Sequence, residues 1–249
     1  MKTMTLEHSL YIRRSIGDLP QDVIENHSLT QKHATVYFQG SLSDPESFAI
    51  ATPYEPGEVT CYGVNLGEIF DSLCDTGKFD GFVLETSSKE ALIGRFGQKY
   101  GKKLTSSSTC TYTLLGGQGR MATDAILVGK QDSDLIARAS EHFDWYGFHS
   151  VEEMLEAGFI AGVVRDNELV SVAYTSAFSP RYVDIGVRTR CEYRGKGYAT
   201  ASAAMVLEAL RPTGKTPVWN VTTDNGASIR ICRKLGFRKV YEKSYLCRQ

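Results

Sequence analysis

The chain has 249 residues, of which 42% are hydrophobic, and its 28 Lys and Arg against 29 Asp and Glu give a net charge of −1. This composition excludes collagen-like, disordered and membrane-spanning proteins, and the length allows one large domain or two modest ones. Because a near-neutral chain has no long-range field that attracts polyanions, we expect no nucleic-acid partner.

Targeting and cysteine patterns favour a reducing compartment. The first eight residues, Met1 to His8, lack the apolar stretch of a secretory signal, and no apolar run reaches the length of a membrane span. The cysteines show neither Cys-x-x-Cys spacing nor paired histidines nearby, so neither a zinc site nor a disulfide framework is indicated. We therefore expect a cytoplasmic chain with reduced thiols, no metal and no membrane association. A homodimer is compatible with these patterns.

The first half of the chain mixes short strands and helices, and neither an internal repeat nor a chemical motif stands out. The elements expected there are strands at 35–38, 48–51 and 82–84 and helices at 65–73 and 88–100. A Ser- and Thr-rich stretch at 105–109 is typical of a linker, and a Gly-rich stretch at 115–119 follows a short strand. These breaks predict a smaller α/β domain of unknown role at 1–122 and a second domain at 123–249.

The second half shows clearer patterns. A capping box at Ser150 and Glu153 predicts a short helix that ends at Gly158, and Asp166-Asn167 predicts the turn of a β-hairpin. The other elements expected there are strands at 125–128, 159–165, 168–178, 182–188, 217–221 and 239–246 and helices at 133–143, 198–210 and 227–235. This succession predicts a compact α/β domain.

One segment of that domain carries the chemistry. The pattern Arg194-x-x-Gly197-x-Ala199 lies where the strand at 182–188 passes through a loop into the helix at 198–210. Small residues at such a junction let backbone N–H groups approach an anion, and the helix N-terminus adds unsatisfied donors and partial positive charge. The loop is therefore a candidate diphosphate-binding site.

A second signature follows at a suitable distance: Asn225-x-x-Ser228, a helix, and then Lys234-Leu235-Gly236-Phe237. Together, the two motifs resemble those of the GNAT superfamily of acyl-CoA-dependent N-acetyltransferases. This resemblance implies a mixed, mostly antiparallel sheet flanked by helices, with acetyl-CoA as co-substrate. The residues that it assigns to coenzyme A binding are Ile185, Gly186, Val187, Arg194, Gly195, Lys196, Gly197, Tyr198, Ala199, Thr200, Asn225 and Ser228.

The resemblance also suggests how protons could move. Family members often carry a carboxylate on the strand before the loop, so Asp184 is the candidate base; a solvated edge position is the alternative. Many members have a tyrosine as general acid where this chain has Cys232, which is either a replacement acid with an apparent pKa near 8–9 or a packing residue. The aromatic stretch 141–149 borders the acceptor site in the family, and core packing is its other interpretation.

These observations predict acetyl transfer from acetyl-CoA to a primary amine of a small molecule or peptide by direct attack. A non-catalytic acyl-CoA-binding regulatory module is the alternative, because Cys232 departs from the family pattern. Aminoacyl transfer from charged tRNA, which paired GNAT-like domains perform, is a third hypothesis, and the near-neutral charge argues against it. The total length and the division into two halves also give a looser resemblance to zwittermicin-resistance-type acetyltransferases.

Overall fold

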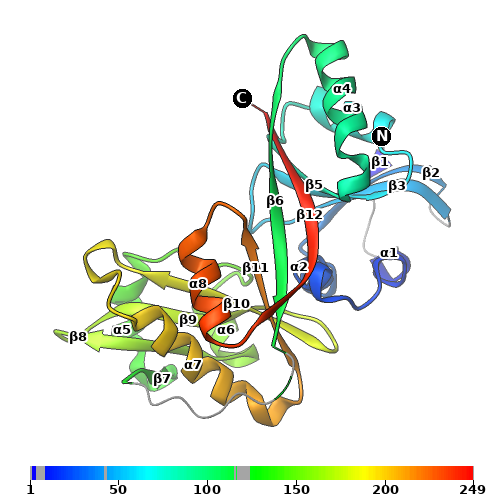
Figure 1. Ribbon diagram of the computed structural model, residues 1–249. Coiled ribbons are helices and arrows are strands. Elements are labelled where there is room, and N and C mark those ends of the chain that lie inside the picture. Colours follow the sequence, from blue (N-terminus) through cyan, green and yellow to red (C-terminus); the bar gives the residue numbers. More distant parts are fainter. Residues whose placement is uncertain (1, 4–8, 42–43, 115, 117–123, 249) are drawn as a thin grey trace. The chain divides into compact units, whose positions relative to one another are not determined.

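The computed structural model describes residues 2–3, 9–41, 44–114, 116 and 124–248 (Figure 1). They form two compact units that are not contiguous in sequence. The first unit comprises Met1–Cys110, Val221–Asp224 and Tyr241–Gln249, and the second comprises Thr111–Asn220 and Asn225–Val240. The expected boundary between residues 122 and 123 lies outside the described residues, and the division into domains 1–122 and 123–249 stays a prediction.

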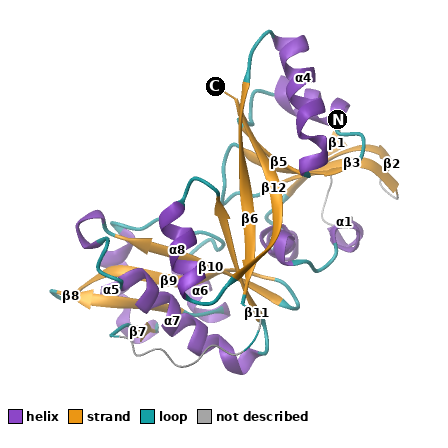
Figure 2. Cartoon of the chain, viewed as in Figure 1, coloured by secondary structure: helices purple, strands orange, loops and turns teal. Residues whose placement is uncertain are grey.

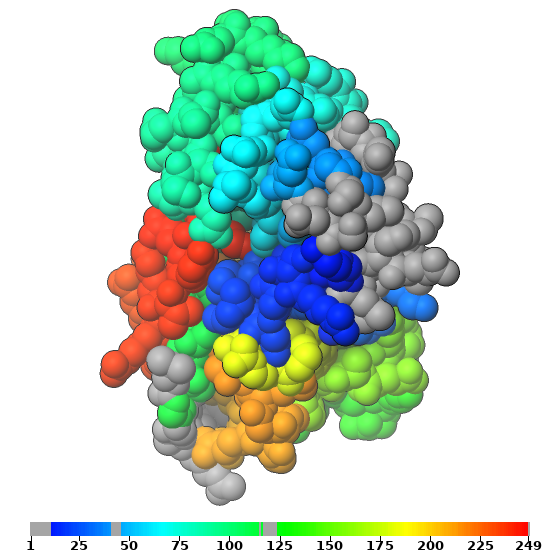
Figure 3. Space-filling view, turned by 90° about the vertical axis from the view of Figure 1, so that its right-hand side faces the viewer, coloured from blue at the N-terminus to red at the C-terminus, as the bar shows by residue number. Residues whose placement is uncertain are grey.

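The first unit has a mixed sheet with the strand order β1-β2-β3-β4-β5-β12-β6, in which β12 (Arg238–Arg248) contributes its residues from Tyr241 onward. Its elements are β1 (Lys2–Thr3), α1 (Ser9–Ile16), α2 (Val23–Thr30), β2 (Thr35–Ser41), β3 (Asp44–Ala51), β4 (Glu58–Gly63), α3 (Gly67–Asp75), β5 (Gly81–Leu84), α4 (Lys89–Tyr100) and β6 (Leu104–Thr113). Apolar side chains such as Phe70, Phe82 and Phe96 pack α3 and α4 onto the sheet. The blue segment that carries α1 is exposed on the face shown in Figure 3.

The second unit has the strand order β6-β11-β10-β9-β8-β7. Its elements are β7 (Ile126–Val128), α5 (Ser133–Ser140), α6 (Val151–Ala157), β8 (Ile160–Arg165), β9 (Glu168–Phe178), β10 (Tyr182–Thr189), α7 (Tyr198–Leu210), β11 (Thr216–Thr222), α8 (Gly226–Lys234) and the start of β12, up to Val240. Ile136 of α5 and Met154 of α6 share a core with Tyr174 of β9. Ala201 of α7 packs with Val170 in a separate cluster, so helices flank the sheet (Figure 2). The mixed, mostly antiparallel sheet flanked by helices is thus confirmed.

The two halves of the chain repeat one order of elements: a strand, two helices, three strands, a helix, a strand, a helix and a strand. The parallel strand pair also occupies the same place in each half, since β4 pairs with β5 in parallel and β10 pairs with β11 in parallel. The structure thus shows a repeat of topology that the sequence patterns did not indicate. Topology repeats here without a visible repeat of sequence motifs.

The stretch 105–109 was wrongly interpreted as a linker. It lies inside β6, and the amide of Thr223 donates a hydrogen bond to the carbonyl oxygen of Ser108 at 2.9 Å. Threonine is β-branched and favours extended backbone, so a Thr- and Ser-rich run is compatible with a strand once another strand pairs with it.

A buried group of charged and polar side chains lies in the first unit. The ammonium of Lys243 is 2.7 Å from Oδ1 of Asp22, and these two side chains are 6% and 4% exposed. Tyr62 donates a hydrogen bond to the same oxygen at 2.8 Å, and Thr60 donates one to Glu25 at 2.6 Å. Burial raises the pKa of Glu25, while the nearby Lys243 lowers it. One buried cation therefore pairs with Asp22 and acts electrostatically on the nearby Glu25.

Within the described residues, no helix combines the length and apolar character that crossing a bilayer requires. All six cysteines are free, and most are buried. No group of three or more His, Cys, Asp and Glu side chains in the described part of the chain is arranged to hold a metal ion.

Candidate functional site

The glycine loop of the second unit joins a short 3-10 helix, Cys191–Tyr193, to α7. Gly195 and Gly197 have φ angles of +77° and +82°, which L side chains rarely adopt, and a Cβ added at either position meets no atom within 4 Å. Gly197 is the N-cap of α7. Because glycine has no side chain, no N-cap side chain accepts a hydrogen bond from the first N–H groups of the helix. An open, left-handed loop before bare helix donors fits a diphosphate.

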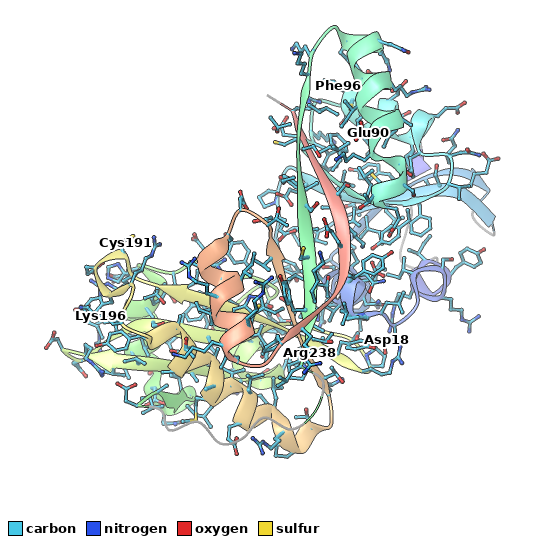
Figure 4. The ribbon with its side chains drawn as sticks, in the orientation of Figure 1. Asp18, Glu90, Phe96, Cys191, Lys196 and Arg238 are labelled. Atoms are coloured by element: carbon cyan, nitrogen blue, oxygen red, sulfur yellow. The ribbon has the colours of Figure 1, made fainter. Side chains whose placement is uncertain are left out.

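The charges around this loop also suit an anion. Lys196 and Cys191 lie at its exposed end (Figure 4). The ammonium of Lys196 lies 4.9 Å from the ring centroid of Tyr193, and the first turn of α7 contains no acidic residue. Arg194 is exposed, and its Nε is 3.4 Å from the carbonyl oxygen of Thr189. Cations on a loop without nearby acidic side chains in the helix favour phosphate binding.

The strands that lead to the loop separate next to it. β10 and β11 pair in parallel only over three positions, the last of which joins Asp184 to Val218. From Ile185 to Thr189, β10 continues to pair with β9 on its other side. The edge of β10 that faces β11 therefore lacks a strand partner over Ile185, Gly186 and Val187. Backbone groups at such an edge are available to an extended ligand arm.

Gly186 gives β10 a close contact with β9. A Cβ added there would lie 2.5 Å from the ring of Tyr174, a buried side chain. Burial raises the pKa of Tyr174 to about 12, so its hydroxyl remains protonated at neutral pH. The ring of Trp145 lies 5.3 Å from that of Tyr174, edge to face. Gly186 is thus required for the packing of β9 against β10 beside the open edge.

Asp184 lies where the two strands separate, and it is 7% exposed. Ser176 donates a hydrogen bond to its Oδ2 at 2.6 Å, and the Asn220 amide donates one to its Oδ1 at 3.0 Å. Burial raises the pKa of Asp184, whereas these two hydrogen bonds and two more from the backbone of Asn220 and Ile185 lower it. The alternative of a solvated edge residue was wrong, because the carboxyl group is enclosed and bonded at both oxygens. Its role in proton transfer stays a prediction.

Cys232 is fully buried in α8, and its thiol is 3.3 Å from the carbonyl oxygen of Ile229. Burial raises the pKa of the thiol to about 11, above the value near 8–9 expected if Cys232 is the general acid, and its role stays a prediction. A thiol in this environment is a weak proton donor at neutral pH, so the geometry favours the packing role.

The replacement of Cys232 by alanine therefore tests the acid hypothesis directly. We expect Cys232→Ala to leave the shape of the pH–rate profile unchanged between about pH 6 and 9, because the thiol stays protonated across this range. Steady-state rates of both proteins at matched acetyl-CoA saturation measure this. Loss of an alkaline limb in the variant would restore Cys232 as the general acid.

Asn225 and Ser228 each have a structural partner at the start of α8. Asn225 caps the helix, because its side chain accepts a hydrogen bond from the Ser228 amide at 3.0 Å. The hydroxyl of Ser228 accepts a hydrogen bond from the indole N–H of Trp219 at 2.8 Å. The motif is therefore explained as a helix start, and contact of these side chains with coenzyme A stays a prediction.

The aromatic stretch between α5 and α6 divides between core and surface. Phe143 and Phe148 are buried in the core that α5 and α6 share with β9, as the packing interpretation predicts. Gly147 has a φ of +97°, and a Cβ there would lie 1.5 Å from the carbonyl oxygen of Ser176, so this loop contacts β9 closely. Tyr146 stacks under the guanidinium of Arg188, 4.8 Å from its ring centroid.

The first unit lacks the glycine loop at the equivalent place. There, β4 passes into α3 through three residues, and Glu68 lies in the first turn of the helix. A Cβ at Gly67 would lie 3.0 Å from the guanidinium of Arg95, so the helix start is covered. An acidic first turn and a covered helix start disfavour a diphosphate. Of these two helix starts, the start of α7 is therefore the better candidate for an anion site.

Known proteins resemble the chain in both sequence and structure. The family model described as GNAT acetyltransferase matches residues 82–246. The uncharacterized N-acetyltransferase YdfB of Bacillus subtilis (strain 168) is 27% identical over 121 residues, which are 47% of this chain and 46% of that protein. The match thus spans about half the length of that curated relative.

Solved structures resemble the chain over almost its whole length. A GCN5-related N-acetyltransferase-like protein from Streptococcus suis 89/1591 has a TM-score of 0.71 at 19% identity, covering 98% of this chain and 99% of that one. A GNAT-family acetyltransferase from Colwellia psychrerythraea has a TM-score of 0.62 at 12% identity and full coverage of both chains. At these identities the likeness shows the fold. The family model matches more than half of the sequence, and on that ground the chain belongs to the GNAT acetyltransferase family.

Proposed function

We propose that the second unit transfers the acetyl group of acetyl-CoA to a primary amine of a small molecule or peptide. The observation that carries this proposal is the open glycine loop at the start of α7, which directly follows the unpaired edge of β10. The loop supplies donors for the diphosphate of the co-substrate. The adjacent strand edge supplies backbone groups for its extended arm and for the thioester carbonyl.

Direct attack requires a bound thioester, a polarised carbonyl and a neutral amine at contact distance. A backbone N–H on the open edge of β10 would stabilise the developing oxyanion while the amine nitrogen bonds to the carbonyl carbon. The C–S bond then breaks, coenzyme A leaves as the thiolate, and the amine loses a proton. Because an amine with a pKa of about 8–10 is mostly protonated at pH 7, the rate should rise with pH until the acceptor is neutral.

Release of free thiol from acetyl-CoA in the presence of an amine panel tests the proposal. We expect thiol release that depends on at least one amine and yields the acetylated amine in equal amount. Tight acetyl-CoA binding without turnover across small amines and peptides would instead support the non-catalytic, regulatory module.

The number of bound co-substrates tests the assignment to one unit. We expect isothermal titration to give one acetyl-CoA per chain, because the first unit has Glu68 and Arg95 where the second has its open loop. Two equivalent sites per chain would contradict this assignment.

The repeated order of elements gives one reason to retain aminoacyl transfer from charged tRNA as a second candidate, since that reaction was assigned to paired GNAT-like domains. The net charge of −1 still disfavours a polyanionic substrate. Incubation with aminoacyl-tRNA and an amine or peptide acceptor distinguishes the two, because only this candidate predicts loss of the aminoacyl group from tRNA without acetyl-CoA.

A further inference from the structure

A chain of side-chain hydrogen bonds crosses the second unit where β10 and β11 separate. Thr111 of β6 donates to Oδ1 of Asn220 at 2.7 Å, and the amide of Asn220 on β11 donates to Oδ1 of Asp184 at 3.0 Å. Ser176 of β9 donates to the other oxygen of Asp184 at 2.6 Å. Three hydrogen bonds thus connect side chains from adjacent strands β6, β11, β10 and β9.

The hydrogen bond between Asn220 and Asp184 lies just beyond the last backbone pair of β10 and β11. The last parallel pair joins Asp184 to Val218, and Asn220 lies two residues further along the diverging β11. Its side-chain amide reaches back to the Asp184 carboxyl group, so one side-chain bridge spans the first part of the opening. Thr111 and Ser176 fix the bridge from either end, and both are buried. Buried and fully partnered polar networks of this kind restrict the geometry of what they connect.

Resting on the proposed function, we propose that Asp184 and Asn220 form a positioning bridge that sets the opening between β10 and β11, and that Asp184 is not the base of the reaction. The bridge holds the start of the unpaired edge at Ile185, where the thioester carbonyl would be polarised. Asp184 is 7% exposed and accepts hydrogen bonds at both oxygens, which suits a structural acceptor better than a group that must reach an incoming amine.

Exchanging the carboxyl group of Asp184 and the amide of Asn220 distinguishes a role of Asp184 in the positioning bridge from a role as the base. In Asn220→Asp two carboxyl groups face each other about 3 Å apart. While they share a proton the bridge persists, but once the pH is high enough for both to ionise their repulsion breaks it, so the variants are compared on the alkaline side of that titration. In the double variant Asp184→Asn/Asn220→Asp, the new amide at 184 donates to the carboxylate at 220. Thr111 still donates to the side chain at 220, and Ser176 still donates to the side chain at 184. All three hydrogen bonds are retained, with the central donor reversed, while position 184 has lost its carboxylate.

We expect Asn220→Asp to lower kcat at least about tenfold with little change in the KM for acetyl-CoA, since the loop that binds the diphosphate is untouched. Adding Asp184→Asn in the same chain should recover most of this loss and the wild-type pH–rate profile. A double variant that stays as slow as Asn220→Asp, or that loses the acidic limb of the profile, would overturn the proposal and restore Asp184 as the base. An Asn220→Asp protein with wild-type kcat would overturn it as well.

A second measurement does not require activity. If the wild-type protein acetylates none of the amines, the proposed function is wrong, but the positioning bridge can still be tested. Amide hydrogen exchange at residues 185–188 reports how firmly the edge of β10 is held. Exchange should accelerate in Asn220→Asp and return toward the wild-type rate in the double variant. Equal exchange in all three proteins would show that no bridge sets this opening.

Discussion

Gly197→Asp is expected to lower the affinity for acetyl-CoA at least about tenfold, which corresponds to about 1.4 kcal/mol. Gly197 is the N-cap of α7 with a φ of +82°, and the space around its missing Cβ is open. An aspartate there places a negative charge where the diphosphate of the co-substrate would lie. An L side chain on this left-handed backbone costs about 1–2 kcal/mol of stability, so affinity is compared only in protein shown to be folded, by its circular dichroism and unfolding curve. Isothermal titration with acetyl-CoA measures the change.

Two variants separate charge from shape at this position. Gly197→Asn has nearly the same size, carries no charge and tolerates a left-handed backbone, so it should lose less affinity than Gly197→Asp. Arg194→Gln should also lose less, because the proposed binding depends mainly on backbone amides. Equal affinity of folded Gly197→Asp and wild-type protein would remove the loop as the diphosphate site.

The second half of the fold could be predicted from the sequence because local signals coincide there. The Ser150 side chain accepts a hydrogen bond from the Glu153 amide as the capping box predicts, and Asp166 and Asn167 adopt the positive φ angles of the expected hairpin turn. In the first unit such signals are weaker. Helix α2 has charged and polar residues buried on several sides, so its sequence lacks an amphipathic pattern. The buried partners of those residues come from distant segments, which local patterns cannot show.

The candidate site divides in the same way. The glycine loop is a local motif, so its position and the helix after it follow from the sequence. The positioning bridge depends on Thr111 and Asn220, which are far apart in sequence and meet only because β6 and β11 are neighbours in the sheet. Neither residue had a motif to single it out. The burial that raises the pKa of Cys232 also comes from packing of α8 and is absent from local sequence.

Lys243→Met is expected to reduce the free energy of unfolding by about 3–5 kcal/mol, because it leaves two buried carboxyl groups without their cation. The Lys243 ammonium lies 2.7 Å from Asp22, both side chains are nearly inaccessible, and the charge of Lys243 also acts on Glu25. The matched control is Lys130→Met. Lys130 is also 2.7 Å from its partner, Glu156, but both side chains are 65% exposed, so water screens the pair and its loss should cost far less. Urea unfolding of each protein measures both changes.

We expect the titration of Glu25 to make the free energy of unfolding depend on pH. Burial raises its pKa in the folded state above the ordinary value of 4.5, so the folded protein binds this proton more tightly than the unfolded chain. The resulting stabilisation is fully present below the unfolded pKa and is lost as pH rises through the folded pKa. Glu25→Gln removes this titration, keeps an acceptor for the Thr60 hydroxyl and leaves one carboxylate opposite Lys243. The variant should therefore gain stability relative to wild type as pH rises above about 4.5. If the unfolding free energies of wild type and Glu25→Gln change with pH in parallel, burial does not raise the pKa of Glu25 in the folded protein.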